Sequence, residues 1–230
     1  MRHLKLLILA LAVLGAITAT AADTALALPT VLPEALHSWT GKSTSQFEIL
    51  NPGGVETTCA AATAEGTLEE GRPSGLFHLH FKECIIDFKG TEAECTGEGE
   101  ETGVILVLGT WHFVYDTLST SLSSAGVAML FSLGAVKYEC GSSSDSIEVK
   151  PGGMALCLIP NPTALTRRFE FHCTKAGSAH RPAETKYYDG GGTLVGIAPI
   201  LSSQNGEPTI ELTLVGSLAV EFKEDALIMI

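Results

Sequence analysis

The chain has little positive charge, and this shortage limits the partners that it can bind. It contains 14 Lys and Arg residues against 26 Asp and Glu residues, a formal net charge of −12 at pH 7. Without residues 1–27, which we interpret below as an export signal, 12 basic and 25 acidic residues remain, net −13. No cluster of Lys or Arg is then left to neutralise a phosphate backbone. The composition therefore excludes nucleic acid as a partner, and an acidic surface is also repelled by anionic lipid.

Long hydrophobic runs are missing after residue 27. The longest mostly apolar stretch, Ala125–Val136, is interrupted by Ser132 and two glycines. A membrane-spanning helix needs about 18 or more consecutive apolar residues. The sequence therefore predicts no transmembrane span in the mature chain.

Several short functional motifs are also absent. No Cys-x-x-Cys spacing occurs, so zinc-ribbon and thioredoxin-type sites are not predicted. No Gly-x-Ser-x-Gly nucleophile elbow is present. The glycines of the segment Asp189–Gly192 do not reach the third position of a dinucleotide fingerprint, and we interpret that segment as a turn. Glu98, Glu100 and Glu101 lack the ordered spacing of a calcium loop and are predicted to be solvated.

The first 27 residues have the features of a cleavable export signal. Arg2 and Lys5 give a basic start, and the apolar stretch Leu6–Ala16 is too short to span a bilayer. A small-x-small cleavage site follows at Ala25-Leu26-Ala27, so we predict that the mature protein begins at Leu28. A cut after Ala19-Thr20-Ala21 is the alternative. The expected location is outside the cytoplasm, either secreted or at the cell surface.

The six cysteines, an even number in an exported chain, predict a framework of disulfides. Six cysteines allow 15 pairings, so only spacing can guide a choice. Cys84 and Cys95 flank a polar Gly/Glu loop, and Cys157 and Cys173 end two strands joined through Pro160-Asn161-Pro162. We therefore predict the pairs Cys84–Cys95 and Cys157–Cys173, which leave Cys59 to pair with Cys140.

Alternating apolar residues, short apolar runs and frequent turn residues predict strands throughout the mature chain. The clearest alternation is in Leu76–Phe81, where Phe77, Leu79 and Phe81 are expected on the core side and His78 and His80 on the solvent side. The predicted strands are Gln46–Leu50, Val55–Ala61, Leu76–Phe81, Val104–Leu108, Trp111–Tyr115, Val127–Leu133, Val136–Cys140, Ile147–Val149, Ala155–Ile159, Arg168–Cys173, Thr185–Tyr188, Thr209–Leu214, Leu218–Phe222 and Leu227–Ile230.

This pattern predicts an all-β protein, an antiparallel β-sandwich or barrel-like fold stapled by disulfides. Residues 28–230 are expected to form a single domain, with a possible subdivision near residue 150. Two segments, Thr91–Thr102 and Lys175–Pro182, are expected to be loops.

Three histidines are the candidate metal ligands. His78 and His80 alternate along one strand and so project from the same face, an arrangement that offers two imidazole nitrogens to one metal ion. His112 lies on another predicted strand and is the candidate third ligand, with His172 as an alternative. A solvent-facing pair of histidines without metal explains the same pattern. No cofactor and no catalytic residue are predicted.

Several short motifs follow one another in a characteristic order: the signal, Leu-Pro, Thr40–Ser43, Val55–Cys59, Phe81–Cys84, a Glu/Gly stretch through Cys95, a strand ending at Cys140, and a Lys/Tyr-Asp-Gly-Gly segment at 186–191. In this order the chain resembles a group of exported β-rich proteins of soil actinobacteria of the Solirubrobacter and Conexibacter type. That group has no assigned activity, so the resemblance implies a secreted β-rich protein and no catalytic residue. Cys157 and Cys173 are additions to its usual cysteines, which favours their pairing with each other.

Two functions agree with these features. The first is an exported, disulfide-bonded protein with a structural, surface or binding role, whose partner lies in the cell wall or the extracellular space. The second is a secreted hydrolase that uses a metal ion or a pair of carboxylates such as Glu170 and Glu211. Glycoside hydrolysis needs only two carboxylates about 5–9 Å apart and leaves no local motif.

Overall fold

The computed structural model describes a chain built from β-strands. The described residues are 30–32, 37–50, 56–70, 74–88, 90–116, 126–141, 146–149, 152–159, 167–173, 186–189, 193–204, 210–223 and 227–229. No helix among them is long and apolar enough to cross a membrane. The predicted signal and the predicted mature terminus, Leu28, lie outside the described residues.

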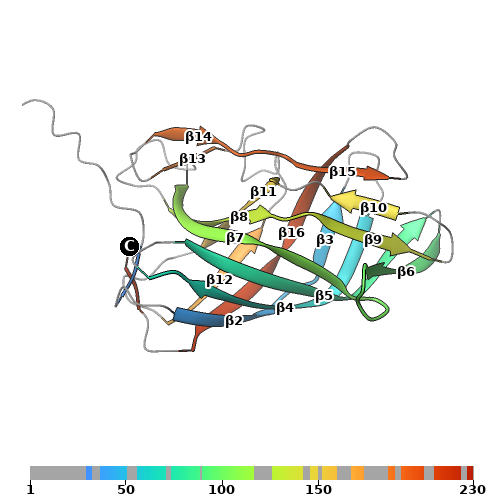
Figure 1. Cartoon of the computed structure of the whole chain (residues 1–230), viewed down its shortest axis with the longest axis horizontal. Helices are drawn as coiled ribbons and strands as arrows, with labels where there is room; N and C mark the ends of the chain where they lie inside the picture. The colour runs from blue at the N-terminus through green and yellow to red at the C-terminus, as the bar shows by residue number, and fades with distance from the viewer. Residues whose placement is uncertain are drawn as a thin grey trace, which may run out of the picture.

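Eight strands form a closed antiparallel barrel, which is the barrel alternative of the predicted fold class (Figure 1). The ring closes where β16 pairs with β2, with Leu218 opposite Ser43. In order around the ring the strands are β2 (His37–Ser43), β4 (Glu56–Leu68), β5 (Ser74–Phe88), β7 (Ile105–Asp116), β8 (Val127–Leu133), β11 (Met154–Ile159), β12 (Arg168–Cys173) and β16 (Ile210–Phe222).

The barrel continues into a second ring because β4, β5 and β16 are long, with 13, 15 and 13 residues. Their far parts pair with five further strands, and these pairs close a ring again. The five strands are β3 (Phe47–Leu50), β6 (Thr91–Gly97), β9 (Val136–Cys140), β10 (Ser146–Val149) and β15 (Ile200–Gln204). Closure leaves none of these strands with an unpaired edge.

Four short strands lie outside the two rings. β13 (Lys186–Tyr188) and β14 (Leu194–Gly196) form a hairpin that extends the end of β7. β1 (Thr30–Leu32) pairs with β17 (Leu227–Met229) in a separate two-stranded sheet. Strand pairs such as β8 with β11 and β2 with β16 join residues from both sides of position 150.

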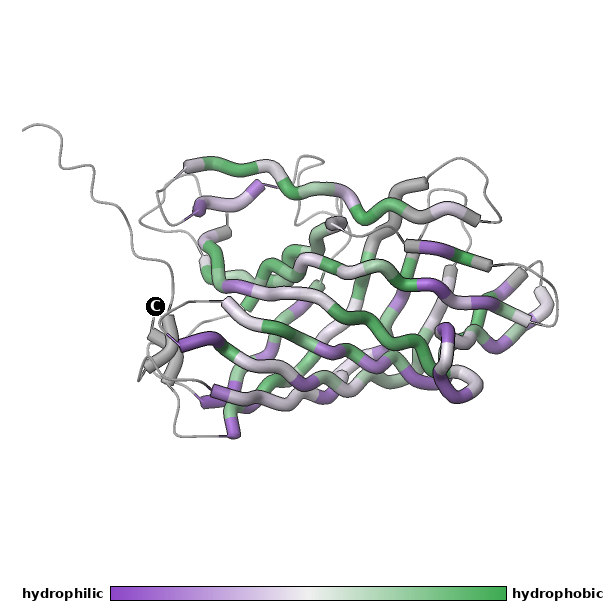
Figure 2. Tube along the Cα trace, viewed as in Figure 1, coloured by the Kyte–Doolittle hydropathy of each residue, from purple (hydrophilic) through white to green (hydrophobic). Residues whose placement is uncertain are grey.

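Hydrophobic and hydrophilic residues alternate along the strands, as the colours of the tube in Figure 2 show. The large apolar side chains of these strands are buried. The predicted alternation in β5 is confirmed: Phe77, Leu79 and Phe81 are buried, while His78 is exposed and His80 is half-buried. Edge-to-face ring contacts connect the interior aromatic residues, the arrangement that the ring quadrupole favours. The contacting pairs are Trp39–Trp111, Trp111–Phe113, Phe47–Phe81 and Phe77–Phe131.

Two glycines that read as strand breaks in the sequence lie within continuous strands. The predicted strands Val104–Leu108 and Trp111–Tyr115 form the single strand β7 through Gly109. A Cβ on Gly109 would lie 2.1 Å from the Ser132 carbonyl oxygen and 2.7 Å from the Phe77 ring. Gly216 likewise joins the two predicted parts of β16, where a Cβ would lie 2.4 Å from the Phe47 ring. Both glycines therefore permit close packing.

The predicted loop Thr91–Thr102 is wrong over its first half, which forms strand β6. Along β6 the exposed residues Glu92 and Glu94 alternate with the inward residues Cys95 and Gly97, both buried. The inward face consists of small side chains, so the apolar alternation that indicates a strand was weak in the sequence. Four other strands, β1, β2, β14 and β15, were also not predicted.

The disulfides are Cys59–Cys84, Cys95–Cys140 and Cys157–Cys173, with no free cysteine. The predicted pair Cys157–Cys173 is confirmed, whereas the predicted pairs Cys84–Cys95 and Cys59–Cys140 are wrong. Each disulfide joins residues that face each other on neighbouring antiparallel strands, with Cα–Cα distances of 4.0 to 4.1 Å.

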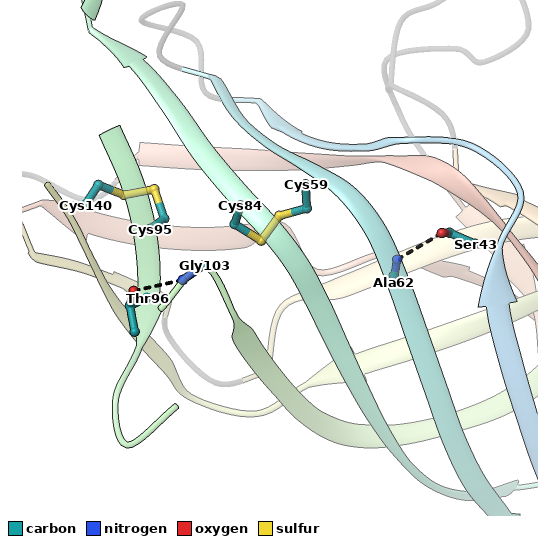
Figure 3. The surroundings of a disulfide bond; sticks show 8 residues. All are labelled: Ser43, Cys59, Ala62, Cys84, Cys95, Thr96, Gly103 and Cys140. Carbon is teal, nitrogen blue, oxygen red and sulfur yellow. Dashed lines mark hydrogen bonds between the residues drawn. A yellow bond between two sulfur atoms is a disulfide. The ribbon is translucent and has the colours of Figure 1, made fainter. Parts of the chain in front are cut away.

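The observed pairing follows from the arrangement of four cysteines in one row across β4, β5, β6 and β9 (Figure 3). Cys84 and Cys95 are the inner members of the row, on neighbouring strands of a hairpin. Cys59 and Cys140 are its outer members, three strand spacings or about 14 Å apart, which no disulfide can bridge. Full pairing within the row therefore requires each inner cysteine to bond outward.

Candidate functional site

The histidine pair lies on the outer surface of β5. His78 faces Glu65 on β4, and its Nδ1 atom is 3.6 Å from a carboxylate oxygen of Glu65. His80 faces Thr63 on β4 and Leu106 on β7. The two imidazoles therefore share the outer face, as the sequence predicted.

The strand register separates His112 from this pair. His112 faces Ser74 on β5, whereas His78 faces Leu108, so the positions are four residues apart along the strands. Four residues of extended strand span about 13 Å. Among the residues that the structure describes, no group of three or more His, Cys, Asp or Glu side chains could hold a metal ion. The structure therefore does not bring the three predicted ligands together.

His112 instead lies against the β13–β14 hairpin. Its ring contacts Tyr187 edge-to-face, with ring centroids 6.3 Å apart. Burial lowers the pKa of His112 from 6.5, because the charged imidazolium loses hydration there. The pKa of Tyr187 is raised above 10.0. Burial is the larger cause, and the negative charge of Asp189 is the smaller one.

An acidic hollow of about 670 Å³ opens on the outer surface at β6 and β9. Its charged lining residues are Glu94, Glu98, Glu100, Lys137 and Glu139. The loop between β6 and β7 is fixed by backbone hydrogen bonds, in which Gly97 donates to Val104 and Glu98 donates to Lys137. Glu98 and Glu100, predicted to be solvated, thus border an open surface.

A second hollow, of about 350 Å³, lies over the outer faces of β2, β4 and β5. Its lining includes Glu65, His78, Lys223 and Leu76, which is 53% exposed. Leu108, on the neighbouring strand β7, is 45% exposed and faces His78. The surface beside this hollow therefore combines the contact between His78 and Glu65 with exposed apolar side chains.

The barrel interior offers far less space. Two voids among its described residues measure about 20 and 40 Å³, and mostly apolar side chains line both. Trp39 and Trp111 are buried in the interior. Binding sites for small molecules usually measure about 300–1,000 Å³. The hollows of that size in the described structure are on the outer surface.

One polar cluster on the outer face of β12 and β16 was not predicted from the sequence. His172 and Ser217 face each other on these strands and share a hydrogen bond through Nδ1 and Oγ. Thr44 donates a hydrogen bond to Glu170, and the Ser217 amide donates to Ser45 at 2.9 Å. These residues come from three distant parts of the chain, so no local motif connects them.

The carboxylate pair Glu170 and Glu211 does not form a catalytic pair. Glu170 faces Ala219 on β16, eight residues along that strand from Glu211. Eight residues of strand correspond to about 26 Å, well beyond the 5–9 Å separation that glycoside hydrolysis needs. Of the predicted turn Asp189–Gly192, the structure describes Asp189, whose carboxylate accepts the Thr193 N–H at 2.8 Å, and the other residues lie outside the described part.

The fold and its surfaces thus define a disulfide-bonded, all-β barrel protein with a filled interior. No protein-family model, no curated protein and no solved structure matches the chain.

Proposed function

We propose that this protein is an exported binding or structural protein that contacts a cell-wall or extracellular partner with the outer surface of its barrel. The filled interior is the observation that carries the proposal. The interior voids of about 20 and 40 Å³ are too small for an ordinary ligand, whereas the outer hollows of about 350 and 670 Å³ fall in or near the usual range. The sizes of these spaces therefore favour a partner that binds on the outer surface of the barrel.

The disulfides support a location outside the cytoplasm. All six cysteines are paired, and each is at most 5% exposed. Disulfides form and persist in oxidising compartments, while cytosolic thiols are kept reduced. The three pairs therefore suggest an oxidising, extracytoplasmic environment.

The location is tested by producing the full chain with its own leader in a bacterial host and separating the cell fractions. The protein is expected outside the cytoplasm with all six cysteines oxidised and Leu28 at its amino terminus, as determined by N-terminal sequencing. Retention in the cytoplasm with reduced cysteines would contradict export. A mature start at Ala22 would contradict only the cleavage site.

The binding role is tested by sedimenting the mature protein with purified, insoluble bacterial cell wall. We expect saturable co-sedimentation that falls with an outer-surface change, either Leu76→Asp or the double variant Glu98→Gln/Glu100→Gln. The interior change Leu79→Val is the matched control and should leave binding unchanged. Sensitivity only to the interior change, or saturable binding of a fluorescent fatty acid, would overturn the proposal.

A further inference from the structure

A second apolar cluster lies outside the barrel, on the outer face of β7, β8 and β11. Its members alternate with interior residues such as Phe113 and Met129, so they point away from the barrel. The wall residues of this cluster are between 0% and 4% exposed: Val114, Ala128, Leu130 and Leu156. Strand β8 is therefore buried on both faces.

The β13–β14 hairpin, which we call the flap, covers this cluster. Tyr187 of the flap is 9% exposed and belongs to the cluster, and Val195 and Ile197 pack against it. The flap is attached to the end of β7, with Tyr187 opposite Asp116. Its two strands have three residues each, so few backbone hydrogen bonds hold it. The flap is thus a small unit whose position depends on side-chain packing.

His112 occupies the border between the flap and the cluster. It lies on the outer face of β7, faces Leu130 of the cluster on β8, and contacts the Tyr187 ring of the flap. A neutral imidazole packs favourably there. An imidazolium in the same position loses part of its hydration, and no described side chain supplies a counter-charge.

Among the side chains that the structure describes, those facing His112 offer no compensation for that charge. Strand β5 presents Ser74 opposite His112, strand β8 presents Leu130 and Ser132, and the flap presents the neutral phenol of Tyr187. The charge of Asp189 acts on Tyr187. Among the described side chains, burial is what determines the protonation of His112, and no carboxylate raises its proton affinity.

We propose that the flap is a pH-sensitive cover, released from the outer apolar cluster in mildly acidic solution when His112 takes up a proton, while the barrel stays closed. Burial lowers the pKa of His112 in the closed form below the 6.5 of a solvated imidazole. The open form therefore binds the proton more tightly, and opening increases as the pH falls below 6.5. One proton can change the opening equilibrium by at most about tenfold per pH unit.

Hydrogen exchange of the disulfide-intact mature protein, expressed as protection factors at pH 7.5 and 5.5, tests the proposal. We expect protection of the flap peptides at 186–188 and 194–197 to fall several-fold at pH 5.5, while β4 and β5 keep theirs. His112→Phe keeps a ring against Tyr187 without a titrating group, and should make flap protection independent of pH. His78→Asn is the matched control on the open outer face and should behave as wild type.

Three results would overturn the proposal. The first is flap protection that does not change between the two pH values in the wild-type protein. The second is a wild-type pH response retained by His112→Phe and also by His112→Gln, the second variant in case Phe disturbs packing. The third is a joint loss of protection in the flap and in β4 and β5, which would indicate global unfolding.

Discussion

At the scale of single residues, the face of the barrel on which a side chain lies decides what that side chain does. Leu79 is 8% exposed and points inward, while its neighbour His78 faces Glu65 on the outer surface. Adjacent residues on one strand therefore occupy opposite environments, one apolar and one aqueous. The same substitution, to Asp, should therefore lower the stability of the protein by different amounts at these two positions.

We expect Leu79→Asp to lower the free energy of unfolding by several kcal/mol and His78→Asp to lower it by less than about 1 kcal/mol. A carboxylate at residue 79 would be buried without a partner. At residue 78 it would remain hydrated, and its repulsion by Glu65 would be screened by water. Urea unfolding of both variants measures the difference. Equal losses would contradict the assigned facing of the strand.

Tyr138 provides a test at alkaline pH. It is 2% exposed, and burial raises its pKa above 10.0, opposed by a smaller lowering from a hydrogen bond with Thr57. The folded state therefore favours the neutral phenol. Its contribution to stability is complete below pH 10 and is lost as the pH rises through the folded pKa.

Tyr138→Phe should consequently flatten the fall in stability between pH 9 and 11, measured as the urea midpoint of each protein. Phe lacks the hydroxyl, so its baseline stability at pH 9 is lower by the lost Thr57 hydrogen bond, about 1 kcal/mol. The slope with pH, and not the baseline, is the relevant quantity. An unchanged slope would show that Tyr138 does not titrate in this range.

At the scale of the element, close packing determines where a strand can pass. Gly109 allows β7 to run past Phe77 and Ser132, and Gly216 allows β16 to run past Phe47. In a sequence, glycine within an apolar alternation indicates a break as readily as a close approach. Only the positions of the neighbouring strands show whether such a glycine ends a strand or lies within one at a close contact.

Gly109→Ala should therefore cost several kcal/mol of stability, because its Cβ would overlap the Ser132 carbonyl oxygen. Gly196→Ala is the matched control: no atom lies within 4 Å of its added Cβ. The control should change stability by less than about 0.5 kcal/mol. Thermal unfolding of the two variants measures both values, and similar losses would contradict the packing described at Gly109.

At the scale of the whole molecule, ring closure brings distant parts of the chain together. β2 and β16 meet to close the barrel, and the row of four cysteines crosses β4, β5, β6 and β9. The row also places Cys84 beside Cys95, a neighbour to which it is not bonded. If Cys59, the disulfide partner of Cys84, is removed, Cys84 should be close enough to react with Cys95.

Cys59→Ser is expected to change the disulfide connectivity of the row. The Cys84 thiolate formed would attack Cys95 of the Cys95–Cys140 disulfide, which creates Cys84–Cys95 and releases Cys140 as a thiolate. Non-reducing peptide mapping at mildly alkaline pH should find the new pair and the free Cys140. Cys157→Ser, in a separate pair, should leave both disulfides of the row intact. A Cys59→Ser protein with only Cys95–Cys140 would contradict the proximity of Cys84 and Cys95.

The sequence determined the features that depend on neighbouring residues. Period-two alternation was sufficient to predict an all-β fold, the opposite facing of His78 and Leu79, and several strand boundaries, because side chains alternate between faces in any strand. The pair Cys157–Cys173 was also predictable, since a short connection joins its two strands.

The tertiary structure decided which strands are neighbours. That choice separated His112 from His78 and His80, set Glu170 and Glu211 far apart, and required Cys84 and Cys95 to bond outward within their row. It also placed the flap on the outer apolar cluster and brought Ser217 to His172. Pairing between distant strands depends on the closure of the whole barrel, which no short stretch of sequence encodes.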